Sequence, residues 1–68
     1  MLTGVIVDME TTYSTGDNGM CEENIITIQS NNQNYTVSIS SIDYRELAIG
    51  SKIQFSLYRD RIDQIVFQ

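Results

Sequence analysis

The sequence contains no histidine among its 68 residues. Histidine is the usual general base and the proton carrier of serine and cysteine triads, so its absence excludes those mechanisms. Paired carboxylic acids work as acid and base only when an apolar pocket holds one of them, and so short a chain has little room for such a cleft. We therefore expect that the protein is not an enzyme.

Cysteine occurs once, as Cys21, so no internal disulfide can form. Without histidine there is also no set of ligands for a structural zinc ion. The neighbouring Glu22 and Glu23 disfavour a thiolate, so we expect Cys21 to lie in a loop over an apolar gap. Residues 17–19 resemble part of a calcium loop, but the EF-hand spacing and its distal glutamate are missing. The sequence predicts neither a metal nor a cofactor.

Long hydrophobic runs are also missing. No stretch approaches the roughly 20 apolar residues of a membrane span, and the start of the chain lacks the basic segment of a signal peptide. We expect a soluble, cytoplasmic protein. Its length allows one domain, residues 1–68, which would bury only about 60% of the surface that the unfolded chain exposes. The core is therefore expected to be thin.

Basic residues are absent from the first half of the chain. Up to Asn34 there are acids only, whereas the remaining residues carry equal numbers of acids and bases, so the net charge of −5 arises entirely in the first half. Such a charge excess favours solubility, and it also attracts a basic protein partner. The candidate contact residues for that partner are Asp8, Glu10, Asp17, Glu22 and Glu23.

The early part of the chain predicts strands. Residues 2–13 read as one long strand that bends at Gly4 and pairs with different neighbours along its two halves. Residues 14–23 combine glycines with acids and predict a long loop, which is either functional or merely mobile. Residues 24–29 are rich in β-branched side chains, and residues 35–40 alternate, so both predict strands. The side chains of the third strand expected to face the core are Tyr35, Val37 and Ile39.

The segments between the predicted strands contain residues that are typical of turns and of helix ends. Residues 30–34 predict a turn because asparagine tolerates positive φ. Ser41 is expected to cap a short helix that Gly50 terminates. Ile42, together with Leu47 or Ile49, is expected to plug one end of the core.

The final part of the chain predicts a hairpin. Residues 52–58 alternate again, with Ile53, Phe55 and Leu57 expected to face inward. A tight turn at Arg59 and Asp60 leads to the last strand, residues 61–67. A bulge between Ile62 and Ile65 would allow both side chains to face the core, followed by Phe67.

Three segments resemble a known family: residues 4–7, Leu47 with residues 50–53, and Arg61-Ile62 followed by Ile65. They are similar to the OB-fold barrels of S1-type domains and of the smallest bacterial translation initiation factor. The resemblance implies an all-β, five-stranded OB-like barrel, closed or partly open, with a short helix between strands 3 and 4. An SH3-like barrel is the alternative fold.

OB folds commonly bind nucleic acid through basic and aromatic side chains on strands 2 and 3. The side chains expected on that outer face are neither basic nor aromatic: Ile25, Thr27, Gln29, Thr36, Ser38 and Ser40. The acids nearby would repel phosphates, so nucleic acid is an unlikely partner for this face. An alternative patch on the last hairpin comprises Lys52, Tyr58, Arg59 and Arg61.

Three functions are consistent with these features. The first is a non-enzymatic acidic module that docks to a basic protein surface, as small acidic phage barrels do when they inhibit a partner by occupying its nucleic-acid site. The second is a homo-oligomeric building block with Ile6, Ile25 or Tyr13 in its interface. The third is an OB protein that binds single-stranded nucleic acid or the ribosome through the hairpin patch.

Overall fold

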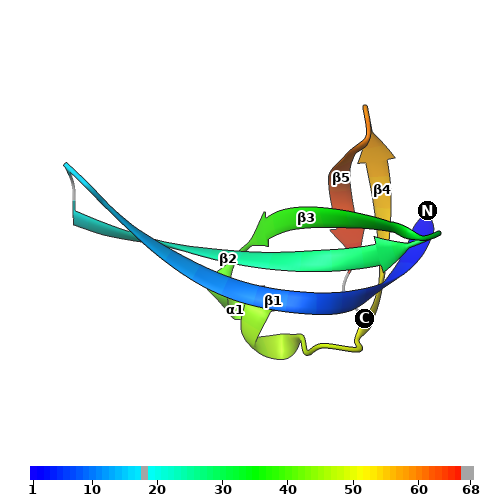
Figure 1. Ribbon diagram of the computed structural model, residues 1–68, viewed down its shortest axis with the longest axis horizontal. Helices are drawn as coiled ribbons and strands as arrows, with labels where there is room; N and C mark the ends of the chain where they lie inside the picture. Colours follow the sequence, from blue (N-terminus) through cyan, green and yellow to red (C-terminus); the bar gives the residue numbers. More distant parts are fainter. Residues whose placement is uncertain (18, 67–68) are drawn as a thin grey trace.

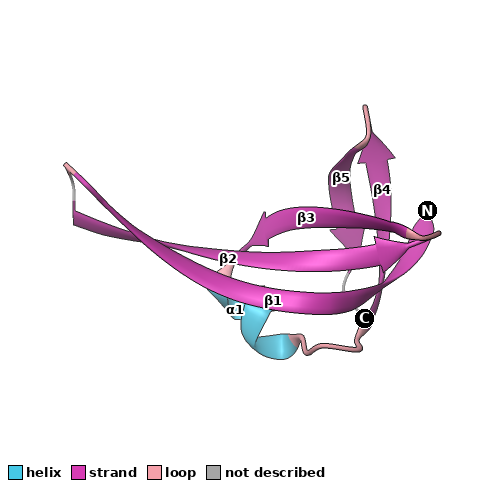
Figure 2. Cartoon of the chain, viewed as in Figure 1, coloured by secondary structure: helices cyan, strands magenta, loops and turns pink. Residues whose placement is uncertain are grey.

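The structure, a computed structural model, describes residues 1–17 and 19–66. Its elements, drawn in Figures 1 and 2, are β1 (Leu2–Gly16), β2 (Gly19–Ser30), β3 (Gln33–Ile39), α1 (Ser41–Glu46), β4 (Lys52–Tyr58) and β5 (Arg61–Val66). The strands form one antiparallel sheet in the order β3-β2-β1-β4-β5. The predicted all-β class, with a short helix between the third and fourth strands, is confirmed.

Strand β1 is shared by both halves of the sheet. It pairs with β4 from Leu2 to Val5 and with β2 from Val5 to Gly16, so Val5 has a partner on each side. This division, which the sequence predicts, makes the sheet curl (Figure 1). The sheet ends at β3 and β5, and no ladder of hydrogen bonds joins these two edges in the described residues. The architecture is that of a partly open barrel.

A bulge interrupts the pairing of β1 with β2 at Val7, beyond the bend that the sequence predicts at Gly4. Ile6 pairs with Ile28 and Asp8 with Thr27, so Val7 is the extra residue of a bulge. Gly4 is required for another reason. A Cβ atom there would overlap Cγ2 of Ile28 and would lie 3.0 Å from Cε1 of Phe55. The missing side chain lets β1 pass directly over the core.

The core consists of five fully buried side chains from β1, β2 and β4: Ile6, Ile26, Ile28, Ile53 and Phe55. Side chains from β3 and the last hairpin pack around them, including Tyr35, Val37, Ile39, Leu57, Ile62 and Ile65. The Tyr35 ring lies 5.6 Å from that of Phe55, centroid to centroid, in a tilted arrangement that aromatic pairs favour. The predicted inward faces of the third and fourth strands are therefore confirmed.

The helix begins one residue earlier than the sequence predicts. Ser40, not Ser41, is the N-cap, because its Oγ accepts a 3.2 Å hydrogen bond from the Asp43 N–H. The helix ends at Glu46, well before Gly50. Gly50 instead adopts φ +97° in the turn before β4 and donates its N–H to the Ile6 carbonyl at 2.8 Å. This turn thus extends the attachment of β1 to the β4 side by one residue.

The predicted plug of the core is confirmed for Leu47 and wrong for Ile42 and Ile49. Tyr44 and Leu47 pack against the core, whereas Ile42 and Ile49 are 70% and 66% exposed. In a helix of six residues only one stripe can face the sheet, and here that stripe includes Tyr44.

The turns of the β2–β3 and β4–β5 hairpins are each two residues long. Asn31 and Asn32 have φ of 53° and 65°, as do Arg59 and Asp60, which is the backbone of a type I′ turn. The first turn is shorter than the predicted range 30–34, because Ser30 and Gln33 already pair. The second turn is confirmed.

The predicted bulge in the last strand is also confirmed. Leu57 pairs with Ile62 but Ser56 pairs with Gln64, so Asp63 is the extra residue. Ile62 and Ile65 therefore both pack against the core. The inward position predicted for Phe67 lies outside the described residues.

The largest difference from prediction concerns residues 14–23, because residues 14–16 and 19–23 lie in strands rather than in a loop. β1 continues to Gly16 and β2 begins at Gly19, with Tyr13 opposite Glu22 and Thr15 opposite Met20. Because β3 ends opposite Asn24, the strands continue beyond the barrel as a two-stranded ribbon, residues 11–16 and 19–24 (Figure 1). Threonine and tyrosine favour extended strands. This preference outweighs the tendency of the glycines at the tip to form a loop.

We predict that Gly4→Ala lowers the free energy of unfolding by about 1–3 kcal/mol, because the methyl group overpacks the contact with Ile28 and Phe55. Gly16→Ala is the matched control, since no atom lies within 4 Å of a Cβ atom built there. Urea unfolding followed by circular dichroism measures both. Equal midpoints for the two variants would contradict the close approach of β1 to the core.

Candidate binding surface

The face of β1, β2 and β3 that points away from the core carries three carboxylates. Strand pairing places Asp8 opposite Thr27, Glu10 opposite Ile25, and Thr12 opposite Glu23. Thr36 and Ser38 continue the face on β3, opposite Thr27 and Ile25. We call this surface the acidic face and define it by Asp8, Glu10, Glu23, Thr27, Thr36 and Ser38. The three acids on it are all exposed.

The carboxylates of the acidic face form a spaced row. Asp8 and Glu10 are two residues apart on one strand, about 7 Å. Glu23 is a diagonal neighbour of Glu10 at a similar separation of about 7–8 Å. At this distance in water two charges repel by only about 0.6 kcal/mol, so the row is tolerated. Ser38 Oγ donates a 2.6 Å hydrogen bond to Oε1 of Glu23, which orients that carboxylate.

The structure brings together only three of the five acids predicted as contacts. Glu22 pairs with Tyr13 and lies on the opposite face of the ribbon from Glu23. Asp17 is in the turn at the ribbon tip. Both are exposed, but neither shares a surface with Asp8 and Glu10. Successive side chains of a strand point to opposite faces. A strand prediction for this segment would therefore have placed Glu22 and Glu23 on different faces, whereas the loop prediction did not.

Two buried polar side chains fix β2 against β1, and the sequence did not indicate either. Asn24 Oδ1 accepts a 3.1 Å hydrogen bond from Oγ1 of Thr11 at the base of the ribbon. Ser30 Oγ donates a 2.9 Å hydrogen bond to the Thr3 carbonyl at the other end of the pair. These bonds hold the register that places the three carboxylates in a row.

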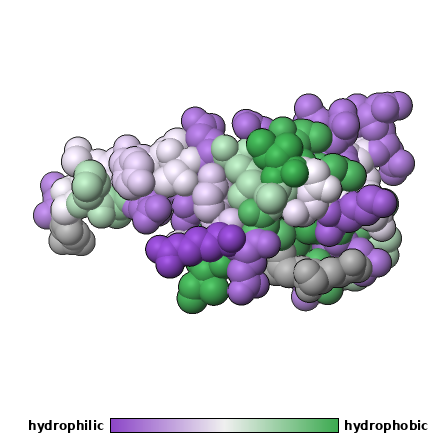
Figure 3. Space-filling model, turned by 90° about the horizontal axis from the view of Figure 1, so that it is seen from below, coloured by the Kyte–Doolittle hydropathy of each residue, from purple (hydrophilic) through white to green (hydrophobic). Residues whose placement is uncertain are grey.

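Figure 3 shows how polarity is distributed on one side of the molecule. The ribbon, which projects from the barrel, is mostly pale or hydrophilic in this view, whereas apolar side chains gather over the barrel and the helix. The exposed apolar side chains of the described residues include Ile42 and Ile49 near the helix and Tyr13 and Met20 on the ribbon.

The alternative hairpin patch is only partly assembled. Tyr58 pairs with Arg61, and the Arg59 guanidinium lies 5.3 Å from the centroid of the Tyr58 ring, within cation–π range. Lys52 is excluded from this group, because it pairs with Val5 at the far end of β4, about 20 Å away along an extended strand. The patch therefore consists of Tyr58, Arg59 and Arg61.

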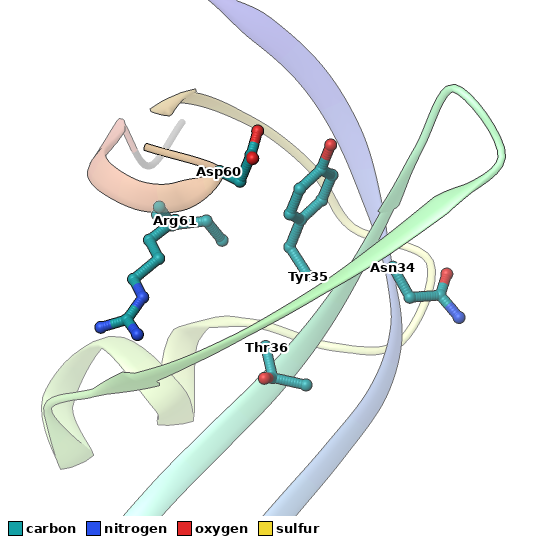
Figure 4. A pocket seen from close by; sticks show the side chains of 6 residues that line it. Asn34, Tyr35, Thr36, Asp60 and Arg61 are labelled. Carbon is teal, nitrogen blue, oxygen red and sulfur yellow. The ribbon is translucent and has the colours of Figure 1, made fainter. Parts of the chain in front are cut away.

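A groove of about 430 Å³ opens where the two sheet edges approach, between the starts of β3 and β5. It is lined by Asn34, Tyr35, Thr36, Asp60, Arg61 and Ile62. Figure 4 shows Tyr35 pointing to the side of β3 on which Asp60 lies, whereas Asn34 and Thr36 leave the strand on other sides. The Tyr35 hydroxyl donates a 2.6 Å hydrogen bond to Oε1 of Gln33. The sequence did not predict this groove, which depends on how the edges approach in space.

The described part of the chain also bears on Cys21, on groups of metal ligands and on membrane-spanning helices. Cys21 is free and exposed on β2, opposite Ser14, and does not cover an apolar gap in a loop. No group of three potential metal ligands occurs among residues 1–17 and 19–66. No helix in those ranges is long and apolar enough to cross a membrane.

The residues predicted for a subunit interface differ in accessibility. Ile6 is fully buried in the core and is therefore excluded from an interface. Ile25 is half-buried on the outer face, and Tyr13 is 65% exposed on the ribbon.

Comparison of the chain with protein-family models, with curated proteins and with solved structures gave no match.

We predict that single-stranded RNA or DNA is not retarded by the protein at about 50 µM and low salt, where electrostatic attraction is screened least. The physical reason is that the acidic face would repel phosphates. An electrophoretic shift assay measures this, with Arg59→Ala/Arg61→Ala as the control for the hairpin patch. Retardation that this double variant abolishes would instead assign nucleic-acid binding to Tyr58, Arg59 and Arg61.

Proposed function

We propose that the protein is a non-enzymatic acidic binding module that docks its acidic face onto a basic protein surface. The observation that carries this proposal is the separation of charge between elements. All five acids of the first half lie on β1, β2 and the turn between them, whereas Arg45, Lys52, Arg59 and Arg61 belong to α1, β4, the last turn and β5. The unit formed by β1 and β2 therefore holds the whole net charge of −5.

The geometry of the acidic face supports a protein partner of a particular kind. Single negative charges spaced by about 7 Å on two paired strands, with hydroxyl groups nearby, offer acceptors to lysine and arginine side chains. Surfaces that bind nucleic acid present such cations in rows, so we propose that the partner is a nucleic-acid-binding protein whose site the module occupies. The charges would mainly raise the association rate and the specificity of docking.

We also propose that the barrel is OB-like. Support comes from the sharing of β1 between β2 and β4, from the helix between β3 and β4, and from the approach of β3 to β5 around the groove. A cytoplasmic location belongs to the same proposal, since the exposed thiol of Cys21 persists most readily in a reducing compartment.

The test is capture of partners from a lysate of the source cells by immobilised protein. We predict that Glu10→Lys/Glu23→Lys loses its basic partners, because the row of charges on the acidic face is reversed. The matched control is Asp43→Lys/Glu46→Lys, which changes the net charge equally but lies on α1. Glu22→Lys is a second control, on the same ribbon but on its other face.

The proposal requires that both controls retain the partners and that nucleic acid competes for them. Equal retention by Glu10→Lys/Glu23→Lys would contradict the assignment of the docking surface. Equal loss in the α1 control would show that net charge, and not the acidic face, determines binding.

A further inference from the structure

We infer that two copies of the chain associate through the outer edge of β1 in the ribbon and form an antiparallel four-stranded ribbon centred on Tyr13. The proposal is independent of the acidic face, because it uses the edge of a strand rather than a face of the sheet. It assigns a role to a long, unpaired strand edge that docking through the acidic face leaves unused.

The β1 edge is unpaired over most of its length. Its attachment to the β4 side ends at Ile6, whose N–H donates to the Ser51 carbonyl at 2.9 Å. From Asp8 to Gly16, β2 is the only described strand that pairs with β1. A two-stranded ribbon in water is marginally stable by itself, and a third strand is what normally stabilises it. The ribbon therefore gains most from a partner that supplies a strand.

The distribution of charge selects the β1 edge over the β2 edge. Natural proteins protect exposed edges with charged side chains. Glu22 and Glu23 are placed in this way on β2, but β1 has no charge from Thr11 to Gly16. This uncharged run, Thr-Thr-Tyr-Ser-Thr-Gly, is rich in residues that favour strands. Two copies of it can pair without repulsion, whereas two β2 edges would oppose carboxylates.

A two-fold axis at Tyr13 gives a strand register in which the side chains that face each other across the two copies are compatible. Tyr13 then opposes its own copy, Thr11 opposes Thr15, and Glu10 opposes Gly16, so no two carboxylates are directly opposed in residues 10–16. Tyr13 is 65% exposed and Met20, its diagonal neighbour across the ribbon, is 71% exposed. An aromatic pair at the axis, flanked by the two methionines, would cover this apolar surface.

Electrostatic repulsion between the copies does not prevent this arrangement. The two β2 strands would be three strand spacings apart, about 14 Å. This separation exceeds the Debye length of about 8 Å at physiological ionic strength, so the carboxylates on β2 are largely screened from each other. Dimerisation should therefore change little with added salt. Docking to a basic partner should weaken with salt, which distinguishes the two interactions.

Disulfide cross-linking tests the register directly. In a Cys21→Ser background, Tyr13→Cys places the two thiols at directly opposed positions, whose Cα atoms lie about 4.5–5.5 Å apart in an antiparallel pair. We expect a covalent dimer under mild oxidation. Thr11→Cys is the matched control, because its two copies would be about 13 Å apart along the strands. Unaltered Cys21 is a second control, since the β2 strands are too far apart to be bridged.

Light scattering during size-exclusion chromatography provides a readout that needs no cysteine. We expect twice the 7.7 kDa of one chain for the unmodified protein. Tyr13→Lys should raise the dissociation constant at least tenfold, whereas Ile42→Lys, which alters an exposed apolar residue on α1, should leave the constant unchanged. A monomer at millimolar concentration, a dimer that survives Tyr13→Lys, or equal cross-linking of Tyr13→Cys and Thr11→Cys would overturn the proposal.

Discussion

The structure depends on the pairing of one strand with two partners. β1 can leave β4 and continue along β2 only because Gly4 has no side chain where the backbone crosses Ile28 and Phe55. The bulge at Val7 then lets both Ile6 and Met9 pack on the core side. In the described residues five apolar side chains are fully buried, and partly buried ones pack around them. This thin core and the backbone pairing of β1 together hold the crossing in place.

The pairing of β1 with β2 also makes the uneven distribution of charge along the sequence an uneven distribution of charge over the molecule. The first 30 residues, which hold all of the excess acid, fold into a single long hairpin, so their charge is not interleaved with the bases of later elements. Half of that hairpin belongs to the barrel and half projects from it (Figure 1). The proposed docking surface lies on a face of this hairpin, and the proposed dimer contact lies on its edge. The two proposals concern different surfaces and can hold together.

Sequence reasoning succeeded where a side chain alternates with a period of two. The inward faces of β3 and β4 followed from this pattern, and the bulge before Ile65 followed from a departure from it, because Ile62 and Ile65 are three residues apart. It failed where the outcome depends on pairing with a distant segment. Residues 14–23 have the composition of a loop, and only their mutual pairing makes them strands.

Other features were also beyond the reach of single-sequence patterns. Ile42 and Tyr44 are both apolar enough for the core, and only the way in which the helix packs against the sheet shows that Tyr44 is the one that faces it. The approach of the edges around Tyr35 and Arg61 is a property of the curled sheet as a whole.

The most direct test of the account is a nuclear Overhauser spectrum of backbone protons. We predict cross-strand contacts between Gly4 and Ile53 and, in the same spectrum, between Tyr13 and Glu22; the first set without the second would mean that the barrel forms but the ribbon does not.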